Sequence, residues 1–365
     1  MRFSSKSKIG LALASVLFVF VCAELGARIW LSYFASRQQT LNYELYTHID
    51  PRYFRFTPHP YLDYVLTPNF RDEWGTSHNS LGFRGAEFPR NKPPGEFRIV
   101  ALGGSTTYDE DLPDNQTHTY YLEDILRHRY GYSNIRVINA GVPGYNSWES
   151  LVNLEFRVLD ISPDLILHYD NNNDVHARLV NPSIYKGDDS AKRMAWSAPA
   201  VAWWEWSAIA RILSRYLHYT RQMGIEDFVY TDQPMFVMNY DQKIGGDPMK
   251  VLDQNPPVYF ERNTRNMLAI ERAHGITPVL ITWQWSPHFG DYTATRHYQK
   301  AYAQHNEVYK RLAAFYDVPL FDMEAVMPQD KEYYEDGRHS NPKGTRKRAE
   351  LIAEFLTSHK LLPRR

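Results

Sequence analysis

The sequence predicts a doubly wound, flavodoxin-like α/β domain, in which a parallel five-stranded sheet carries helices on both faces. The alternation of predicted strands and helices leads to this class. Between about residues 96 and 362, short apolar runs alternate with segments of helical period, and parallel strands require such helical crossovers. Ahead of this region, a basic and then apolar N-terminus predicts a membrane segment. About residues 176–255 interrupt the alternation and are expected to form a helical insert.

The five predicted strands are short runs rich in β-branched and aromatic residues, each bounded by turn residues. They read FRIVALGG, IRVINAG, DLILHYD, TPVLITWQW and VPLFDM in chain order. The helical segments span about Thr119 to Tyr130, Ser147 to Leu159, Pro257 to His274, Thr295 to Tyr316 and Pro342 to His359. In such a fold a ligand binds beyond the carboxyl ends of the strands, so we expect the chemistry in the loops that follow them.

Charge and cysteine content narrow the function. Lys and Arg (41) nearly balance Asp and Glu (42), so no overall field favours nucleic acid, and we expect no nucleic-acid partner. Cys22 is the only cysteine, so the chain can form neither an intramolecular disulfide nor a cysteine-based zinc site.

Residues 1–35 predict a membrane anchor or an export signal. Basic residues precede an uncharged apolar run of 15 residues from Ile9 to Ala23. This run is shorter than the ~20 residues that span a bilayer, but Leu25 to Phe34 extends it if Glu24 and Arg28 are tolerated. These two side chains lie four residues apart and could pair on one helix face. An uncleaved anchor with its basic end inside is the leading interpretation.

Alternatives stay open for this segment. A signal peptide could be cut after Val21, Cys22 and Ala23, which form a small-residue site. Cys22 could be lipidated, although the preceding VFV lacks small residues. The apolar run could also be a buried helix of a soluble domain, an alternative that the basic flank disfavours. We expect a single-pass protein of the cell membrane whose body is periplasmic or extracellular, or else a secreted protein.

Three segments follow the leader. Residues 36–95 are rich in Pro, Tyr and Phe, and we expect them to wrap the main domain, residues 96–362, as an extended prefix. The insert carries tryptophans followed by arginines: Trp196, Trp203, Trp204, Trp206, Arg211, Arg215 and Arg221. These residues predict a helical cap packed on the main domain, a sugar-stacking or acyl-binding wall above the site, or an interfacial membrane contact.

Ser105 ends the stretch IVALGGS, just past the first predicted strand. The preceding Gly103 and Gly104 let the backbone turn sharply and approach a ligand, and the next segment can begin a helix whose N–H groups face an anion. A hydroxyl at that point is well placed to attack a substrate. A helix-capping serine is the alternative.

The motif DGRHSNPKG near the C-terminus combines a carboxylate with an imidazole. Asp336 and His339 stand just before Asn341 and Pro342, which are typical of a helix N-cap and of the first helical residue. The turn can hold the carboxylate against one imidazole nitrogen while the other points at a distant partner, which is the orienting half of a serine triad. An ordinary helix-start turn is the alternative.

Two further strand ends offer hydrogen-bond donors. Gly144 in VINAGVPGYNS can present its N–H with no side chain in the way, and Asn173 in HYDNNNDV can donate from its amide. With the Ser105 N–H, these donors would form an oxyanion hole. Asparagines in such places are often turn formers instead.

Taken jointly, these stretches follow the order Ser, Gly, Asn and Asp-x-x-His, and with them the sequence resembles the SGNH, or GDSL-like, hydrolase family over about Glu96 to Leu361. Gly104 stands where the family has the acid of GDS, and Asn171 stands where it has the glycine of GxND. The leader, the prefix and the motif NSLGFRG are similar to those of bacterial membrane-attached members.

The resemblance implies that Ser105 is the nucleophile, His339 the general base and Asp336 its orienter, with Gly144 and Asn173 as oxyanion donors. It implies a serine esterase that needs neither a metal nor a cofactor.

We expect an acyl ester substrate, foremost an O-acetyl group on a carbohydrate or cell-surface polysaccharide. A lipid esterase or lysophospholipase and an acyltransferase are the alternatives among enzymes. A non-catalytic cell-surface binding protein is the alternative outside them. His288, in WQWSPH, would lie at the rim of the site and contact substrate together with Trp285, or be a plain loop residue.

Overall fold

The computed structural model describes residues 5–188, 201–222 and 247–363, which form two compact units. Of the described residues, the first unit holds 5–54 and 201–222, and the second holds 55–188 and 247–363. These divisions differ from the expected ones. The prefix is divided after Phe54, and the part of the insert around Trp203 groups with the N-terminal helices. Trp196 lies outside the described residues.

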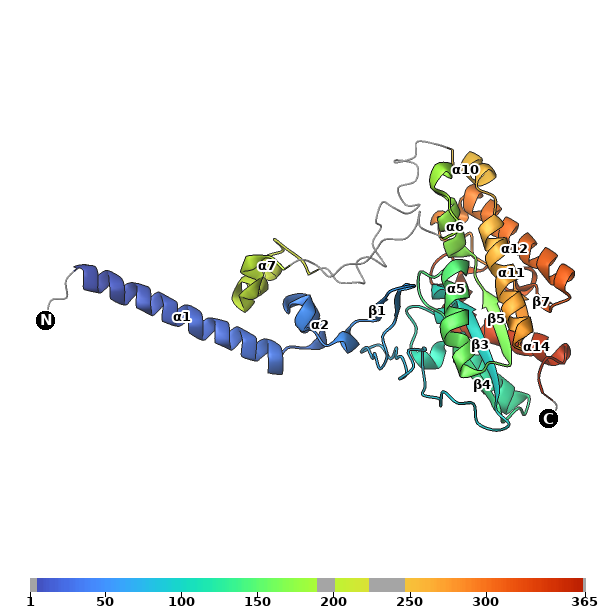
Figure 1. Cartoon of the computed structure of the whole chain (residues 1–365), viewed down its shortest axis with the longest axis horizontal. Helices are drawn as coiled ribbons and strands as arrows, with labels where there is room; N and C mark the ends of the chain where they lie inside the picture. The colour runs from blue at the N-terminus through green and yellow to red at the C-terminus, as the bar shows by residue number, and fades with distance from the viewer. Residues whose placement is uncertain (1–4, 189–200, 223–246, 364–365) are drawn as a thin grey trace. The chain divides into compact units, whose positions relative to one another are not determined.

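The second unit is built on a parallel five-stranded sheet, as predicted (Figure 1). Its strands, in the order β4-β3-β5-β6-β7, are β4 (Ile135–Asn139), β3 (Phe97–Gly103), β5 (Leu165–Tyr169), β6 (Thr277–Ile281) and β7 (Leu320–Phe321). The chain runs from β3 outward to β4 and then crosses back to β5, so β3 and β5 flank the switch point where doubly wound folds bind ligands. Gly103 pairs with Tyr169, which brings the exits of these two strands level.

The helices of this unit follow the predicted alternation. The longer ones are α4 (His118–Asp124), α5 (Ser147–Asn153), α6 (Asn172–Arg178), α10 (Pro248–Gln254), α11 (Val258–Ala273), α12 (Arg296–Tyr316) and α14 (Pro342–Ser358), and the shorter ones are α3 (Ser105–Tyr108) and α13 (Met323–Val326). α4 and α5 are shorter than predicted because each continues as a π-helical turn, Ile125–Arg129 and Leu154–Val158. Asn341 caps α14 and Pro342 is its first residue, as predicted.

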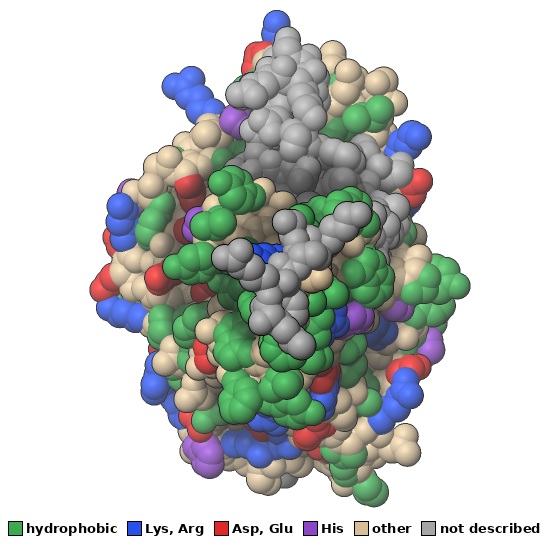
Figure 2. Space-filling view, turned by 90° about the vertical axis from the view of Figure 1, so that its left-hand side faces the viewer, with side chains coloured by type: hydrophobic (Ala, Val, Ile, Leu, Met, Phe, Trp, Pro, Cys, Tyr) green, Lys and Arg blue, Asp and Glu red, His purple; other side chains and the backbone are tan. Residues whose placement is uncertain are grey.

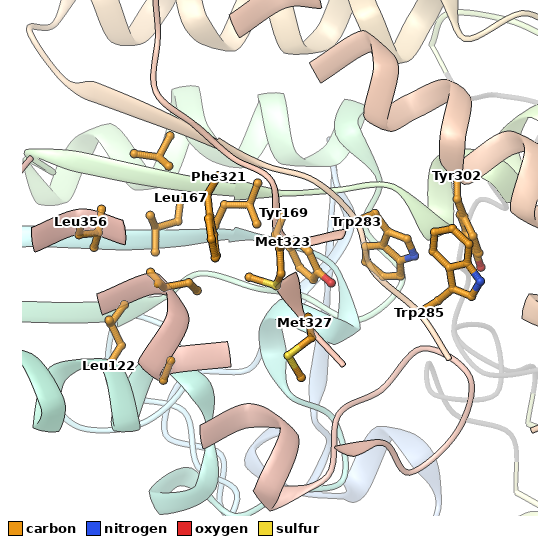
Figure 3. Close-up of a cluster of buried hydrophobic side chains, with 14 of the residues drawn as sticks. Leu122, Leu167, Tyr169, Trp283, Trp285, Tyr302, Phe321, Met323, Met327 and Leu356 are labelled. Carbon is orange, nitrogen blue, oxygen red and sulfur yellow. The ribbon is translucent and has the colours of Figure 1, made fainter. Parts of the chain in front are cut away.

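The core explains why the strands read as unbroken apolar runs. Successive strand residues point to opposite faces, and both faces are covered. Ile99 and Leu167 join a cluster with Leu122 of α4 and Leu356 of α14 (Figure 3). Val100 and its neighbours on the other face pack against α5 and α11. The sheet is therefore a rigid platform, and the loops at its carboxyl edge carry the variable chemistry.

The second unit also contains the second half of the prefix. Here the chain forms a hairpin of β1 (Phe56–His59) and β2 (Asp63–Leu66), which pair antiparallel. Farther along, Arg84 pairs with Asn139 at the end of β4. Residues 55–95 are thus part of the hydrolase-like body and reach the loops that leave the sheet.

The first unit consists of α1 (Ser5–Tyr33), α2 (Arg37–Tyr43), α7 (Ala208–Tyr216) and short 3₁₀ turns. Within α1, the span Ser7–Tyr33 contains an 18-residue window that has a mean hydropathy of 2.3 and no buried residue. It is long and apolar enough to cross a membrane, a property that anchors and signal sequences share.

Candidate active site

Ser105 is the first residue of α3, directly after β3 and the N-cap Gly104. The amide of a first helical residue has no acceptor within its own helix, so this N–H is free to point at a ligand. Its Oγ lies 2.9 Å from Nε2 of His339, a residue 234 positions away in the sequence. The structure therefore brings the two most widely separated of the predicted residues into hydrogen-bond contact.

His339 is held in place by the turn that precedes α14. Oδ2 of Asp336 accepts a hydrogen bond of 2.9 Å from Nδ1 of His339, and its Oδ1 accepts from the backbone N–H groups of Arg338 and His339, each at 2.7 Å. With Nδ1 protonated, Nε2 is the acceptor for the Ser105 hydroxyl. His339 is only 8% exposed, so its imidazole is largely shielded from solvent.

The charge of Asp336 is secured by its surroundings. Burial opposes ionisation of this carboxyl, but the hydrogen bonds from His339 and the neighbouring Arg338 guanidinium outweigh it and hold the pKa of Asp336 well below its usual range. The group is thus a permanent acceptor for Nδ1–H over the range in which proteins fold. Such a carboxylate fixes the imidazole tautomer and stabilises the imidazolium.

Asn173 lies near Gly104, the residue before Ser105, and Gly144 lies on the loop that leaves β4. Asn173, the second residue of α6, donates from Nδ2 to the carbonyl of Tyr145 at 2.7 Å, which leaves its other amide hydrogen for a substrate. Gly144 has φ +84°, a conformation that favours glycine. With the Ser105 N–H, these groups are the oxyanion donors that the sequence predicts, and their role stays a prediction.

Gly104 explains one departure from the family pattern. A Cβ at this position would lie 2.8 Å from Nδ2 of Asn173 and 2.9 Å from the carbonyl of Tyr145, closer than side chains tolerate. The absence of a side chain therefore lets the Asn173 amide approach the serine turn. The other departure has a different reason: Asn171 anchors α6 through a hydrogen bond of 2.8 Å from Nδ1 of His305 to its Oδ1.

Glu110 is a functional candidate that the sequence reasoning missed. Its Oε2 lies 4.0 Å from Nε2 of His339, and its Oε1 forms an ion pair of 3.1 Å with Arg55. Glu110 comes five residues after Ser105, just beyond α3, so its position on the turn after the nucleophile was the available signal. Arg55 could not be found in this way, because it belongs to the prefix.

The motif NSLGFRG and the prefix hairpin support the site from outside. Arg84 donates to the backbone carbonyls of Tyr108, Asp109 and Leu112, and thereby fixes the chain after α3. Tyr64 of β2 donates from its hydroxyl to the carbonyl of Pro143 at 2.7 Å, next to Gly144. The prefix thus holds both the turn after Ser105 and the loop that carries Gly144.

α14 is tied to the same turn by a buried ion pair. Arg348 donates to the carbonyl of Thr106 at 2.8 Å and pairs with the carboxylate of Asp109, and both side chains are 2% exposed. Asp109 also accepts from the ring and the backbone of His118, each at 2.6 Å. The helix that follows His339 is therefore linked to the helix that begins with Ser105.

The two predicted substrate contacts differ in access. Trp285 is 9% exposed and packs against Tyr302 with ring centroids 5.0 Å apart (Figure 3). His288 is exposed in the turn after β6. Among the described residues, no hydrogen bond, ion pair or ring contact joins either of them to Ser105 or His339, so both stay predictions, and His288 offers the more accessible surface. His168, by contrast, is a core residue whose Nε2 contacts Glu271 at 2.6 Å.

Among the described residues, no group of three or more His, Cys, Asp and Glu side chains could hold a metal ion. The groups that meet at the carboxyl edge of the sheet are instead a hydroxyl, an imidazole, a carboxylate and amide donors. These are the parts needed for acyl transfer through a serine.

Comparison with solved structures finds chains of low identity. A lipase/acylhydrolase from Enterococcus faecalis is 17% identical, with a TM-score of 0.44 over 72% of this chain and 96% of that one. A GDSL-like lipase from Bacteroides thetaiotaomicron is 15% identical (TM-score 0.41; 74% and 92% covered), and an acetyl xylan esterase is 13% identical (TM-score 0.42; 71% and 98% covered). At these identities and scores the likeness carries no information on the substrate.

We found no match among curated proteins. The sequence profile of the GDSL-like lipase/acylhydrolase family, however, matches residues 101–347. This range includes the predicted triad, the end of β3 and the other four strands of the sheet. The chain therefore belongs to the GDSL-like lipase/acylhydrolase family.

Proposed function

We propose that this acylhydrolase is a serine esterase with Ser105 as nucleophile, His339 as general base and Asp336 as the group that orients the imidazole. The observation that carries the proposal is the continuous hydrogen-bond chain from Ser105 Oγ through His339 to Asp336, with 2.9 Å at each link. A helix-capping role would not require a distant imidazole at the hydroxyl.

The reaction follows from this geometry. Ser105 Oγ forms a bond to the acyl carbon while its proton passes to Nε2 of His339, and Asp336 stabilises the imidazolium. The negative oxygen of the tetrahedral intermediate accepts hydrogen bonds from the N–H groups of Ser105 and Gly144 and from the Asn173 amide. The imidazolium then protonates the alkoxy oxygen, the carbon–oxygen bond breaks and the alcohol leaves.

Deacylation repeats these steps with water. The imidazole removes a proton from the water that attacks the acyl-serine, and it returns the proton to Ser105 Oγ as the acid leaves. If an acceptor hydroxyl takes the place of water, the same site performs acyl transfer. The two outcomes differ only in what occupies the space next to Nε2.

For the substrate we propose an O-acetyl group on a carbohydrate or cell-surface polysaccharide. The support is the polarity around the imidazole, where the Glu110–Arg55 ion pair faces Nε2 and Arg338 pairs with Asp336. Such groups suit a leaving alcohol that carries further hydroxyls more than they suit an acyl tail. A lipid ester remains the alternative, and a long-chain preference would favour it.

For localisation we propose that α1 anchors the protein in the cell membrane, with the hydrolase body outside the cytoplasm. The support is the apolar span Ser7–Tyr33, most of which is exposed, with basic residues at its start. Secretion after cleavage of this segment is the alternative. Membrane fractionation and N-terminal sequencing of the mature protein distinguish the two.

The test of the activity uses the full-length protein in detergent with p-nitrophenyl acetate, butyrate and octanoate, followed by acetate release from an O-acetylated oligosaccharide. We expect hydrolysis that is fastest for acetate and is lost in Ser105→Ala but kept in Ser358→Ala, which removes an exposed hydroxyl far along the chain. Equal activity in Ser105→Ala would overturn the nucleophile. Faster octanoate hydrolysis would overturn the carbohydrate substrate, and no hydrolysis of any ester would favour a binding protein.

A further inference from the structure

The helix α7 of the first unit has its polarity reversed relative to a helix on a soluble surface. Arg211 and Arg215, with side chains 2% and 6% exposed, face inward. Arg211 pairs with Glu44 at 2.7 Å and Arg215 with Glu205 at 3.0 Å. A helix that faces water on its outer side normally buries its apolar face and exposes its charges.

The outer face of α7 and the turn before it are apolar and aromatic. Their exposed members are Trp203 (86%), Trp206 (55%), Leu213 (52%), Tyr216 (67%) and Leu217 (54%), which we call the collar. Trp203 and Trp206 belong to a 3₁₀ turn, Trp203–Trp206, that leads directly into α7. In water this arrangement leaves large apolar area solvated while cationic side chains are buried, which is unfavourable on both counts.

The collar is joined to α1 by hydrogen bonds. Glu24 of α1 accepts from the hydroxyl of Ser207 and the N–H of Ala208, each at 2.9 Å, and from the N–H of Ile209 at 3.1 Å. Arg28 donates to Glu24 at 2.8 Å and to the carbonyl of Trp206 at 2.6 Å. The start of α7 is therefore fixed at one level of α1, and Glu24 is compensated there.

That level falls at one edge of a bilayer whose other edge lies at Lys8. From Lys8 to Glu24 the helix rises over 16 residues, or ~24 Å, which with the reach of the lysine side chain approaches the ~30 Å hydrocarbon thickness. The apolar side chains of α1 between these residues are exposed. Figure 2, which looks from the side of the N-terminus, shows exposed hydrophobic side chains.

We propose that the collar lies in the headgroup and acyl-chain boundary of the bilayer that α1 spans, so that the insert is a second membrane contact of this protein. Tryptophan and tyrosine are enriched at this boundary because their rings are apolar and their N–H or O–H groups stay hydrated. The inward arginines leave the outer face without charge. The proposal rests on the anchor proposed above and goes beyond it, since an anchor alone does not require a collar.

The test uses the single cysteine. In full-length Cys22→Ala protein, a nitroxide label is attached to one new cysteine at a time, at Leu213, Tyr216, Val16 or Phe315, and the protein is placed in vesicles of phosphatidylcholine and phosphatidylglycerol. Val16 reports on α1, and Phe315 of α12, 77% exposed, is the matched control on the second unit. Hydrolysis of p-nitrophenyl acetate and circular dichroism show that each labelled protein is folded.

We expect the labels at positions 213, 216 and 16 to collide more often with oxygen, which enriches in lipid, than with a water-soluble nickel chelate. The label at 315 should show the reverse ratio. If 16 is lipid-exposed while 213 and 216 behave like 315, the collar is overturned and the anchor stands. If 16 is also water-exposed, the anchor fails as well. A third outcome is that the labels at 213 and 216 are shielded from both reagents and show spin coupling that is lost on dilution with unlabelled protein. This result would assign the collar to a contact with a second copy of the chain and overturn the proposal.

Discussion

Substitution of Gly104 by Ala should remove one oxyanion donor without touching the triad. The new Cβ would lie 2.8 Å from Nδ2 of Asn173, whereas ordinary contacts begin at 3.4 Å, so the amide must retreat by the difference of 0.6 Å. Effective oxyanion donors occupy a window of ~2.7–3.1 Å, which is narrower than this retreat. Loss of such a donor costs ~10²–10³-fold in kcat, or ~2.7–4 kcal/mol.

The assay is the steady-state hydrolysis of p-nitrophenyl acetate by Gly104→Ala, Asn173→Ala and the double variant. We expect a large fall in kcat with little change in KM for each single variant, because the donor acts mainly on the transition state. In the double variant the loss should be smaller than the sum of the two single losses, since the amide that the alanine displaces is already gone and only the contact of its Cβ with the Tyr145 carbonyl, at 2.9 Å, remains. Wild-type kcat in Gly104→Ala, or fully additive losses, would refute the role of Asn173.

Three further predictions concern charge and stability. Burial raises the pKa of Asp170 to about 7. The folded protein then binds the carboxyl proton of Asp170 more tightly than the unfolded chain does. The free energy of unfolding should therefore fall by ~3 kcal/mol between pH 5 and 8. Urea unfolding should show this slope in the wild type and not in Asp170→Asn, and equal slopes would contradict the account. Arg348→Met breaks the buried ion pair with Asp109 and should lower the free energy of unfolding by ~3–5 kcal/mol. The control Arg346→Met, at a side chain 62% exposed, should lower it by less than ~0.5 kcal/mol. Equal melting temperatures of the two variants would contradict the role of the buried pair. Asp336→Asn offers a donor where Nδ1 needs an acceptor and should lower kcat by as much as ~10⁴-fold, the loss known for such a change in a serine protease; a loss below tenfold would show that Asp336 does not orient the imidazole.

The sheet and its helices could be predicted because their signals are local. An apolar run such as FRIVALGG, buried on both faces, carries its own evidence, and the N-cap pair Asn341 and Pro342 marks its helix without distant contacts. Helix ends were less well determined. Nothing in the local pattern distinguishes the π-helical turn after α4 from more α-helix.

The candidate site could be predicted as a set of residues, and the contacts among them required the structure. The distance between Ser105 and His339 depends on β3 and α14 meeting at one edge of the sheet. Glu110 and Arg55 were missed for the same reason, because their ion pair joins residues 55 positions apart, one in the prefix. The prefix composition gave no sign of the hairpin that supports the Gly144 loop.

The division of the insert was also beyond the sequence. The sequence did not indicate partners for Arg211 and Arg215, and the structure buries these arginines against Glu44 and Glu205. Local composition cannot show that Arg211 meets Glu44, which lies 167 positions away in the sequence. The tryptophans next to them left several interpretations open, and the exposure of Trp203 and Trp206 favours the membrane contact.

The identity of the nucleophile is tested most directly by mass spectrometry of the full-length protein after reaction with a fluorophosphonate probe. The account predicts one adduct, on the peptide that contains Ser105, absent from Ser105→Ala and formed far more slowly in His339→Ala. An adduct on a different residue, or ester hydrolysis by a protein whose Ser105 never reacts, would contradict it.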